Sequence, residues 1–246
     1  MSQRAKRFST YVTVAWTGVL AACTAGCGSD IFDVDVDLQK QVYTADFGAT
    51  QGTVPLVTCD PAGPEVCSAA VGTTEFASGG VNATIDVACD AGTLRCYARA
   101  HVIGTSAVNV LQDDAFTTKV ARKEINVVRN VDVKLTVPVN TLTFDVPMLN
   151  IFVGPPGSAR EVDPGVVFVG ATLPLAAGTM VADANARHIV VADDSPAHAF
   201  IAESIMNKQT MLFMVSLSPR VEAGAPIPAG TFEVDLVPRV TLGLPF

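Results

Sequence analysis

The sequence predicts an all-β fold: an antiparallel β-sandwich, immunoglobulin-like or related, with one short helix near 195–208. Apolar and polar side chains alternate over 31–43 and 131–139, which is typical of half-buried strands. Further short apolar runs recur at sandwich-like spacing, with Gly and Pro between them. Charged residues make up 16% of the 246-residue chain, below the roughly 25% of average domains, and 49% hydrophobic residues can build a sizeable core.

The N-terminal residues have the charge pattern of an export signal. Arg4, Lys6 and Arg7 precede an uncharged run over 8–22. Ser and Thr dilute this run, and it falls short of the about 20 predominantly apolar residues that a spanning helix needs. A positive stretch followed by a short apolar run predicts a secretory signal peptide.

A cysteine motif ends the apolar run. Leu20-Ala21-Ala22-Cys23 resembles the lipobox of bacterial lipoproteins, and Thr24-Ala25-Gly26-Cys27 is a second match. The resemblance implies that diacylglycerol is attached to the Cys thiol, that signal peptidase II cleaves before it, and that the new N-terminus is acylated. Leu20 favours Cys23, whereas an even number of remaining cysteines favours Cys27. We expect lipidation at Cys23, with Cys27 as the alternative; an ordinary secreted protein cleaved near Ala25 is the other reading.

Lipidation changes the expected location, because two or three acyl chains hold a protein durably on a bilayer. Neither Cys23 nor Cys27 is followed by Asp, a residue that often signals inner-membrane retention in lipoproteins, so the outer membrane is favoured. Once the signal peptide leaves, the 16 basic residues fall to 13 against 24 acidic ones, a net charge of −11. This charge argues against nucleic acid as a partner and against direct docking onto anionic lipid.

The strand predicted over 31–43 has a polar outer face. Three like charges on one strand face repel, so a bridging cation is an alternative to plain solvation of the carboxylates. An EF-hand loop is excluded, because Leu38 and Thr44 stand where a loop starting at Asp33 needs Gly and Glu. The inward side chains are Phe32, Val34, Val36 and Leu38, and the candidate metal ligands are Asp33, Asp35 and Asp37.

The strand over 131–139 alternates most strictly, with Val or Leu at every second position. Pro138 predicts an edge strand or a strand end, because proline cannot donate to a ladder. The alternation continues over 142–148 and closes in a turn over 150–157, which predicts a hairpin or a long bent strand. Further strands are predicted at 53–58, 81–88, 95–103, 106–111, 165–170, 187–192, 210–217 and 231–241.

One segment has helical rather than strand periodicity. Ser195 can cap a helix whose first position is Pro196, and Phe200, Ile201 and Ile205 form one stripe. We expect a short helix packed over a sheet edge or the end of a barrel.

Composition divides the mature chain. After a signal peptide over 1–22 (or 1–26) and a lipidated tether over 23–30, residues 31–115 form a β-rich region that holds four cysteines, while 125–246 is cysteine-free. The charged stretch over 115–124 is either a domain boundary or a long loop inside one domain.

Four cysteines in an exported chain predict two disulfides. Three connectivities are possible, and we favour Cys59–Cys67 and Cys89–Cys96, since short loops close most readily. Each enclosed stretch begins with Asp and contains Ala-Gly, which predicts a turn. Separations of eight and seven residues do not fit the two-residue gaps of zinc knuckles, so no metal cofactor is expected there.

No catalytic motif is present in the sequence. Neither Gly-x-Ser-x-Gly nor a phosphate-binding glycine loop occurs, and His101, His188 and His198 belong to no metal or nucleophile motif. The Asp193–His198 stretch contains Asp, Ser and His, but a helix start explains these residues better than a triad.

The sequence therefore predicts a lipid-anchored cell-envelope protein that acts as a non-catalytic structural or interaction module, not an enzyme. Its expected partners are the membrane, through the lipid, and an envelope protein or polymer; no cofactor is expected. The alternatives are a binding domain for a small apolar or lipidic ligand, which requires a sizeable dry cavity, and an envelope hydrolase, which requires a cleft where carboxylates or a His converge.

Overall fold

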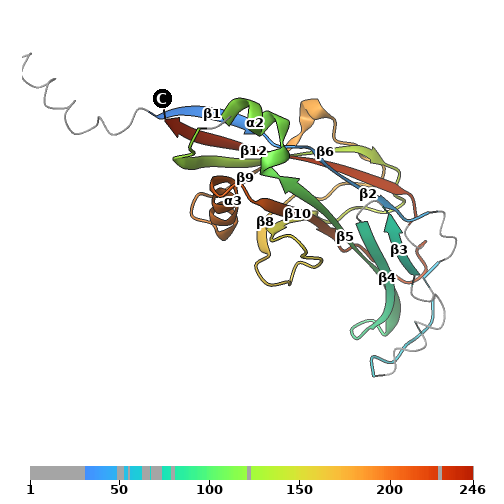
Figure 1. Ribbon diagram of the computed structural model, residues 1–246. Helices are drawn as coiled ribbons and strands as arrows, with labels where there is room; N and C mark the ends of the chain where they lie inside the picture. Colours follow the sequence, from blue (N-terminus) through green and yellow to red (C-terminus); the bar gives the residue numbers. More distant parts are fainter. Residues whose placement is uncertain are drawn as a thin grey trace, which may run out of the picture.

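The computed structural model describes residues 31–48, 53–54, 56–62, 67, 74–78, 81–120, 123–226 and 229–245 (Figure 1). The predicted signal peptide, the tether over 23–30 and the lipidation candidates Cys23 and Cys27 lie outside these residues. No helix within the described ranges is both long and apolar enough to cross a bilayer.

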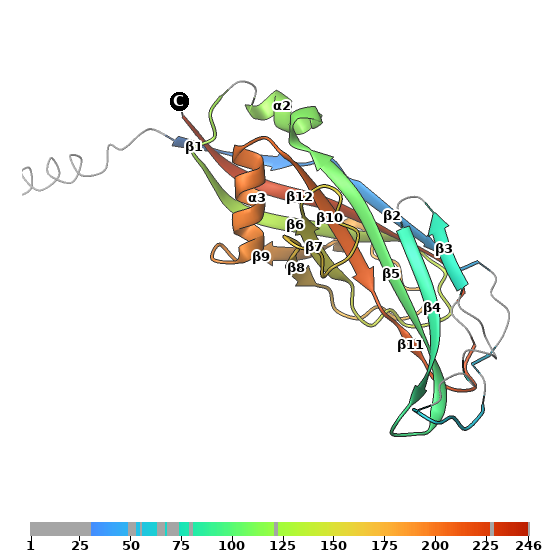
Figure 2. The same cartoon turned by 60° about the horizontal axis from the view of Figure 1, so that its bottom comes forward.

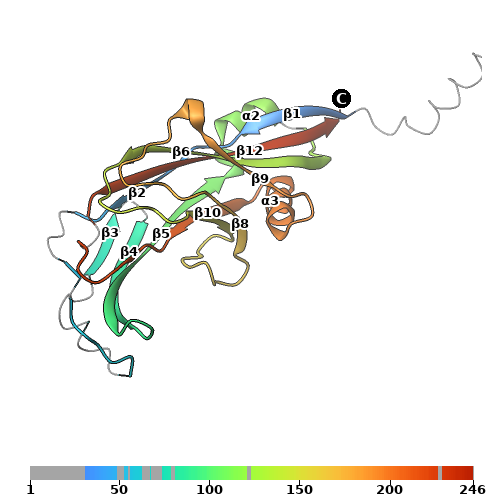
Figure 3. The ribbon, with the colours of Figure 1, turned by 180° about the vertical axis from the view of Figure 1, so that it is seen from behind.

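Two antiparallel sheets pack face to face, which confirms the predicted all-β sandwich (Figures 1 and 3). The five-stranded sheet has the order β1-β12-β6-β9, and β2 pairs with the other half of the β12 edge that β1 occupies. Its strands are β1 (Ile31–Asp37), β2 (Gln41–Asp46), β6 (Val127–Asn140), β9 (Arg187–Val191) and β12 (Thr231–Pro245).

The seven-stranded sheet has the order β3-β4-β5-β10-β7-β8, with β11 paired to β5. Its strands are β3 (Thr74–Ser78), β4 (Val81–Asp90), β5 (Arg95–Asn109), β7 (Asn150–Gly154), β8 (Val167–Ala171), β10 (Thr210–Leu217) and β11 (Arg220–Val221). Short helical segments complete the described fold: η1 (Val110–Gln112), α2 (Asp114–Val120), η2 (Asp183–Asn185) and α3 (Pro196–Met206).

The cysteine-containing and cysteine-free regions share both sheets. β1 and β2 pair with β12, and β5 pairs with β10. Buried side chains from both regions form one core cluster between the sheets. The stretch over 115–124 includes most of α2 and connects strands of the two sheets, so the described residues pack as one unit.

Pro138 lies inside the five-stranded sheet. β6 runs between β12 and β9, so the expectation of an edge strand is wrong, although β9 pairs only as far as Leu135. The alternative of a strand end agrees with the position of Pro138, two residues before Asn140. Between the pairs Val139–Glu233 and Thr136–Asp235, β6 contains one residue more than β12, which makes a bulge that includes Pro138. The bulge lies just before the strand ends at Asn140. A bulge tolerates a residue that lacks an N–H, which explains how an internal strand accommodates this proline.

The predicted strand over 31–43 is interrupted. β1 ends at Asp37 and β2 begins at Gln41. Opposite the gap, Pro238 of β12 lacks an N–H donor, but its carbonyl accepts from the Leu38 N–H at 2.8 Å. Because proline interrupts the ladder at this point, one apolar run becomes two strands along the same edge of β12.

β5 is continuous through Gly104, where two strands were predicted. An alanine Cβ at position 104 would lie 2.5 Å from Cδ1 of Tyr43, so Gly104 lets the buried Tyr43 ring approach the backbone. The glycine therefore serves packing rather than chain reversal.

Three other predicted elements differ from the structure. The segment 150–157, expected to be a turn, contains the strand β7. The described residues of 53–58 and 142–148, expected to be strands, pair through isolated bridges at Thr53, Thr58 and Val146.

Helix α3 confirms the short helix predicted near 195–208. The Ser195 hydroxyl oxygen accepts from the His198 N–H at 3.1 Å, and Pro196 occupies the first helical position. Ala197, Ile201 and Ile205 are buried. The helix contacts β6 of one sheet and β7, β8 and β10 of the other, so it covers an open end of the sandwich.

Candidate functional site

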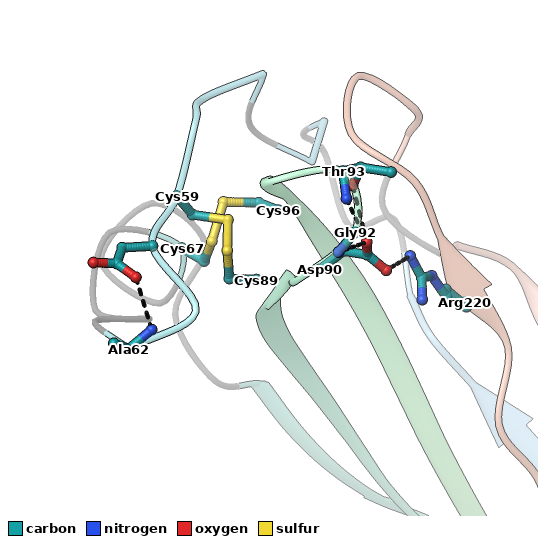
Figure 4. Close-up of a disulfide and its surroundings, with 10 residues drawn as sticks. Cys59, Ala62, Cys67, Cys89, Asp90, Gly92, Thr93, Cys96 and Arg220 are labelled. Carbon is teal, nitrogen blue, oxygen red and sulfur yellow. Dashed lines mark hydrogen bonds and ion pairs between the residues drawn. A yellow bond between two sulfur atoms is a disulfide. The ribbon is translucent and has the colours of Figure 1, made fainter.

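Two disulfides lie at one end of the β4–β5 hairpin (Figure 4). They join Cys59 to Cys89 and Cys67 to Cys96, so the predicted pairs Cys59–Cys67 and Cys89–Cys96 are wrong. The bonds close loops with sequence separations of 30 and 29 residues. We call this disulfide-bonded tip of the hairpin, with Cys59 and Cys67 attached to it, the stapled end.

The physical reason for this pairing lies in the hairpin itself. Cys89 and Cys96 face each other directly in the β4–β5 ladder, whose backbone hydrogen bonds already hold these two positions together. Each of them instead bonds to a cysteine of the preceding segment, which fixes that segment to the sheet. The preference for short loops amounts to only about 1 kcal/mol per disulfide, which tertiary packing can overcome.

Aspartate side chains organise the turns at the stapled end, as the sequence indicates. Asp60 accepts from the Ala62 N–H at 2.9 Å, and Asp90 accepts from the N–H groups of Gly92 and Thr93 (Figure 4). The Arg220 guanidinium also contacts Asp90 at 2.6 Å. The hydrogen bonds from Arg220 and Thr93 lower the pKa of Asp90 to about 2. The turn of the hairpin is therefore tied to β11.

A polar hollow of about 560 Å³ lies next to this end, on the outer face of β4, β5 and the β11 segment. Period-2 geometry explains its composition: Cys96, Ala98 and Ala100 of β5 are buried, so the intervening side chains face outward. The lining residues are Thr84, Asp86, Arg99, His101, Ser218 and Arg220.

A hydroxyl, an imidazole and a carboxylate adjoin one another at this hollow. His101 Nδ1 lies 2.8 Å from Ser218 Oγ, within hydrogen-bond distance. His101 Nε2 lies 3.7 Å from Glu161 Oε2 on the connection between β7 and β8. The buried Ser216 hydroxyl donates to Glu161 Oε1 at 2.5 Å. The imidazole therefore has an exposed hydroxyl on one side and an anchored carboxylate on the other.

The two arginines of the polar hollow differ in their partners. Arg220 is engaged by Asp90 and Glu222, and its guanidinium lies 4.0 Å from the centre of the Tyr97 ring. Arg99 pairs in register with Asp86, yet in the part of the chain that the structure describes no carboxylate lies within ion-pair distance of its guanidinium. The Arg99 guanidinium lies 5.7 Å from the centre of the same Tyr97 ring, so a neutral aromatic face contacts it and its charge remains available to a ligand.

The candidate metal ligands Asp33, Asp35 and Asp37 have separate partners. Asp33 pairs with Arg129 at 3.0 Å, and Asp35 accepts from the Thr241 hydroxyl at 2.7 Å. Arg239 contacts Asp37 at 2.5 Å and thereby lowers the pKa of this carboxyl. Within the described residues these carboxylates do not converge on one point. The solvated outer face that the alternation predicts is therefore stabilised by cross-strand pairs.

The other two histidines have structural surroundings. His198 Nε2 lies 2.7 Å from the Arg129 carbonyl oxygen and 3.7 Å from Asp193 Oδ1. The His198 N–H donates to the cap residue Ser195, as the helix interpretation of 193–198 predicts. His188 lies 2.5 Å from Asp132 on the outer face of the five-stranded sheet. No hydroxyl contact accompanies the His188–Asp132 pair in the described structure.

Other spaces in the described structure offer less to a ligand. An apolar void between them, beneath Tyr43 and Phe232, measures about 20 Å³, which is close to the room one water needs. A second polar hollow of about 300 Å³ lies on the five-stranded sheet, where the ion pairs Lys40–Asp235 and Lys134–Asp183 occupy its charges. A further hollow of about 250 Å³ contains no histidine and is lined by Asp37, Gln39, Gln112, Asp113, Asp114 and Ala115. Among these spaces, the polar hollow beside the stapled end combines volume with a histidine and an exposed hydroxyl, so it is the candidate site.

Comparison with known proteins finds no matching family model, no matching curated protein and no matching solved structure.

Sequence reasoning did not find the constellation in the polar hollow. His101 and Ser218 are 117 residues apart, and Glu161 lies between them on a connection rather than a strand. No short motif spans such separations. The one local signal is the outward-facing histidine on an otherwise mostly apolar β5, which by itself does not identify a partner.

Proposed function

We propose that this protein is a lipid-anchored cell-envelope protein of the outer membrane, held by acyl chains on Cys23, and that its sandwich serves as an interaction module. The lipobox resemblance supports the anchor, with Cys27 as the alternative site. The partner class is an envelope protein or polymer, because a mature net charge of −11 disfavours both nucleic acid and anionic lipid.

The observation that carries this proposal is the position of β1 in the five-stranded sheet. Ile31 pairs with Pro245, so β1 starts beside the C-terminal end of β12 at one end of the sandwich. The stapled end lies at the opposite end (Figures 1 and 2). The 15 residues of β12 alone span about 50 Å. An anchor before residue 31 would therefore present the stapled end and the polar hollow away from the bilayer.

The disulfides fit this placement. An oxidising compartment favours such bonds. They fix the segment that contains Cys59 and Cys67 on the part of the sandwich that lies farthest from the proposed anchor. A surface held in this way loses little conformational entropy when it binds a partner.

Intact mass spectrometry of the protein extracted from membranes tests the anchor. We expect a chain that starts at Cys23 and carries diacylglycerol plus one further acyl group. Cys23→Ser should abolish the acyl adduct and release the protein from membranes, whereas Cys27→Ser should change neither. A chain that starts at Gly26 without an adduct would contradict the proposal.

Photo-crosslinking in intact cells tests the orientation. Leu94 is exposed in the turn between β4 and β5, and Met206 is exposed at the last residue of α3. Helix α3 lies nearer to β1 than the stapled end does (Figure 2). A crosslinker at position 94 should give a defined adduct with an envelope component, and the matched position 206 should not. Equal yields at both positions would contradict a module that binds with its stapled end.

A further inference from the structure

We propose that Ser218, His101 and Glu161 form an acyl-transfer site, in which Ser218 is the nucleophile and short acyl esters of hydroxyl-rich compounds are the substrates. This inference goes beyond the anchored module and replaces the expectation of a non-catalytic protein. It depends on neither lipidation nor orientation, so its failure would leave the proposed anchor intact.

The contact between Ser218 and His101 supplies the first element of the site. The Ser218 side chain is exposed to solvent at the edge of the polar hollow, and its Oγ lies 2.8 Å from His101 Nδ1. When the ring proton is on Nε2, Nδ1 is an acceptor and can take the hydroxyl proton. A nucleophile within hydrogen-bond distance of its base is the geometry that serine acyl transfer requires.

Glu161 supplies the third group. Its Oε2 lies 3.7 Å from Nε2 on the far side of the imidazole, and its Oε1 is held by the Ser216 hydroxyl, whose residue is 3% exposed. The carboxylate is therefore fixed where it favours the Nε2–H tautomer and stabilises the imidazolium that forms during attack. Glu161 is a positioning residue, since it acts through His101 rather than on the substrate. The 3.7 Å contact is within ion-pair distance and longer than a hydrogen bond; catalytic contacts are often looser before substrate binds.

Arg99 gives the hollow an electrophilic group. It lies two residues before His101 on β5, so both side chains project from the same face about 7 Å apart along the strand. Without a carboxylate partner in the described structure, its guanidinium can donate hydrogen bonds to the oxygen that becomes negative when the ester carbonyl is attacked.

The lining of the hollow defines the substrate class. Its other members, Thr84 and Asp86, are polar, and Asp86 can accept hydrogen bonds from hydroxyl groups. Within the described lining no residue has an apolar side chain that could hold a long acyl chain. The chemistry therefore favours a short acyl group, such as acetyl, on a hydroxyl-rich alcohol.

The reaction balances with water as the only co-reactant. Ser218 Oγ attacks the ester carbonyl carbon while its proton passes to His101, and the alcohol departs with that proton, leaving an acyl-serine. Water then attacks the acyl-serine as His101 takes one of its protons. The acid leaves, and the proton returns to Ser218, so ester and water give acid and alcohol.

The test uses the full mature protein in detergent with p-nitrophenyl acetate and with acetylated xylan. We expect turnover of both esters, and an alkyl fluorophosphonate should label Ser218 within the tryptic peptide 209–220. Ser218→Ala and His101→Gln should each lower kcat/KM at least about 100-fold. The matched control His188→Gln alters another surface histidine that contacts a carboxylate and should leave the rate unchanged.

Glu161→Gln separates positioning from folding. It should lower kcat about 10-fold with little change in KM. The conservative variant Glu161→Asp, which keeps the negative charge, should recover part of kcat. A merely structural role would not separate the two variants in this way. Circular dichroism melting of each variant shows whether the fold is kept, and the exposure of Ser218 leads us to expect an unchanged melt for Ser218→Ala.

Three results would overturn the proposal: no ester turnover by the intact protein, turnover that Ser218→Ala leaves unchanged, or fluorophosphonate on Ser216 instead of Ser218. A further variant, Ser218→Cys, keeps the proposal testable if serine labelling is slow. Its thiol should react with iodoacetamide faster than that of Ser158→Cys, a control outside the hollow, and His101→Gln should remove the difference. Equal reactivity of the two thiols would also contradict the site.

Discussion

Removal of the Cys59–Cys89 disulfide provides the sharpest test of the stapled end. In the chain-entropy treatment, closing a loop with the observed separation of 30 residues lowers the entropy of the unfolded chain enough to stabilise the fold by about 3.6 kcal/mol. The alternative pair Cys59–Cys67 would close a loop of about eight residues and contribute about 2.5 kcal/mol. The double variant Cys59→Ala/Cys89→Ala should therefore lose about 3 to 4 kcal/mol in the free energy of unfolding.

Urea unfolding measures this loss, and peptide mapping identifies the bonds directly. Trypsin with glutamyl endopeptidase places each cysteine on its own peptide: 41–65, 66–75, 76–95 and 96–99. Without reduction, 41–65 should remain joined to 76–95, and 66–75 to 96–99. The variant should retain only the second bond.

The matched variant Cys67→Ala/Cys96→Ala should lose a similar amount, because its loop has a separation of 29 residues. Finding 41–65 joined to 66–75 in the wild-type protein would refute the pairing. A loss below about 1 kcal/mol with the correct pairing would refute the entropic argument instead.

Three further changes test the packing, a helix cap and the electrostatics. Gly104→Ala should lower the free energy of unfolding by about 1 to 3 kcal/mol in urea titrations, because its Cβ would lie 2.5 Å from the Tyr43 ring; an unchanged midpoint would contradict this contact. Ser195→Ala should cost about 1 kcal/mol by the same assay, since a helix N–H loses its acceptor, while Ser195→Thr should keep most of the stability. The pKa of Asp90 is lowered to about 2 from 3.8, so its ionised form favours the folded state above pH 4 and this contribution disappears as the pH falls towards 2. Arg220→Gln should raise that pKa in an NMR titration, and a value still near 2 would show that the backbone N–H groups alone hold the carboxylate.

Local chemistry accounts for the parts of the fold that the sequence predicts correctly. Period-2 alternation identifies β1 and β6 because each strand has one face against the core. The cap at Ser195 and the aspartate turns depend on atoms within a few residues of one another. Such short-range contacts form in the same way wherever the segment lies in the fold.

The strand predictions that differ from the structure involve prolines, a glycine and a strand break. The conformation at each of these positions depends on the neighbouring strands. Pro138 is compatible with an edge, a strand end or a bulge, and only the register with β12 selects the bulge. The break after Asp37 depends on Pro238, about 200 residues further along the chain. Gly104 could mark a turn or a close approach, and the Tyr43 ring decides for the close approach.

By itself, the sequence determined the strand-rich class, the helix start, an acidic chain and the presence of four cysteines able to form two disulfides. Only the tertiary structure decided which cysteines pair and that His101 contacts both Ser218 and Glu161. The physical reason is the size of the competing free energies. Loop-closure entropy changes slowly with loop length, so sequence separation discriminates weakly among partners, whereas the packing of two sheets fixes which side chains meet.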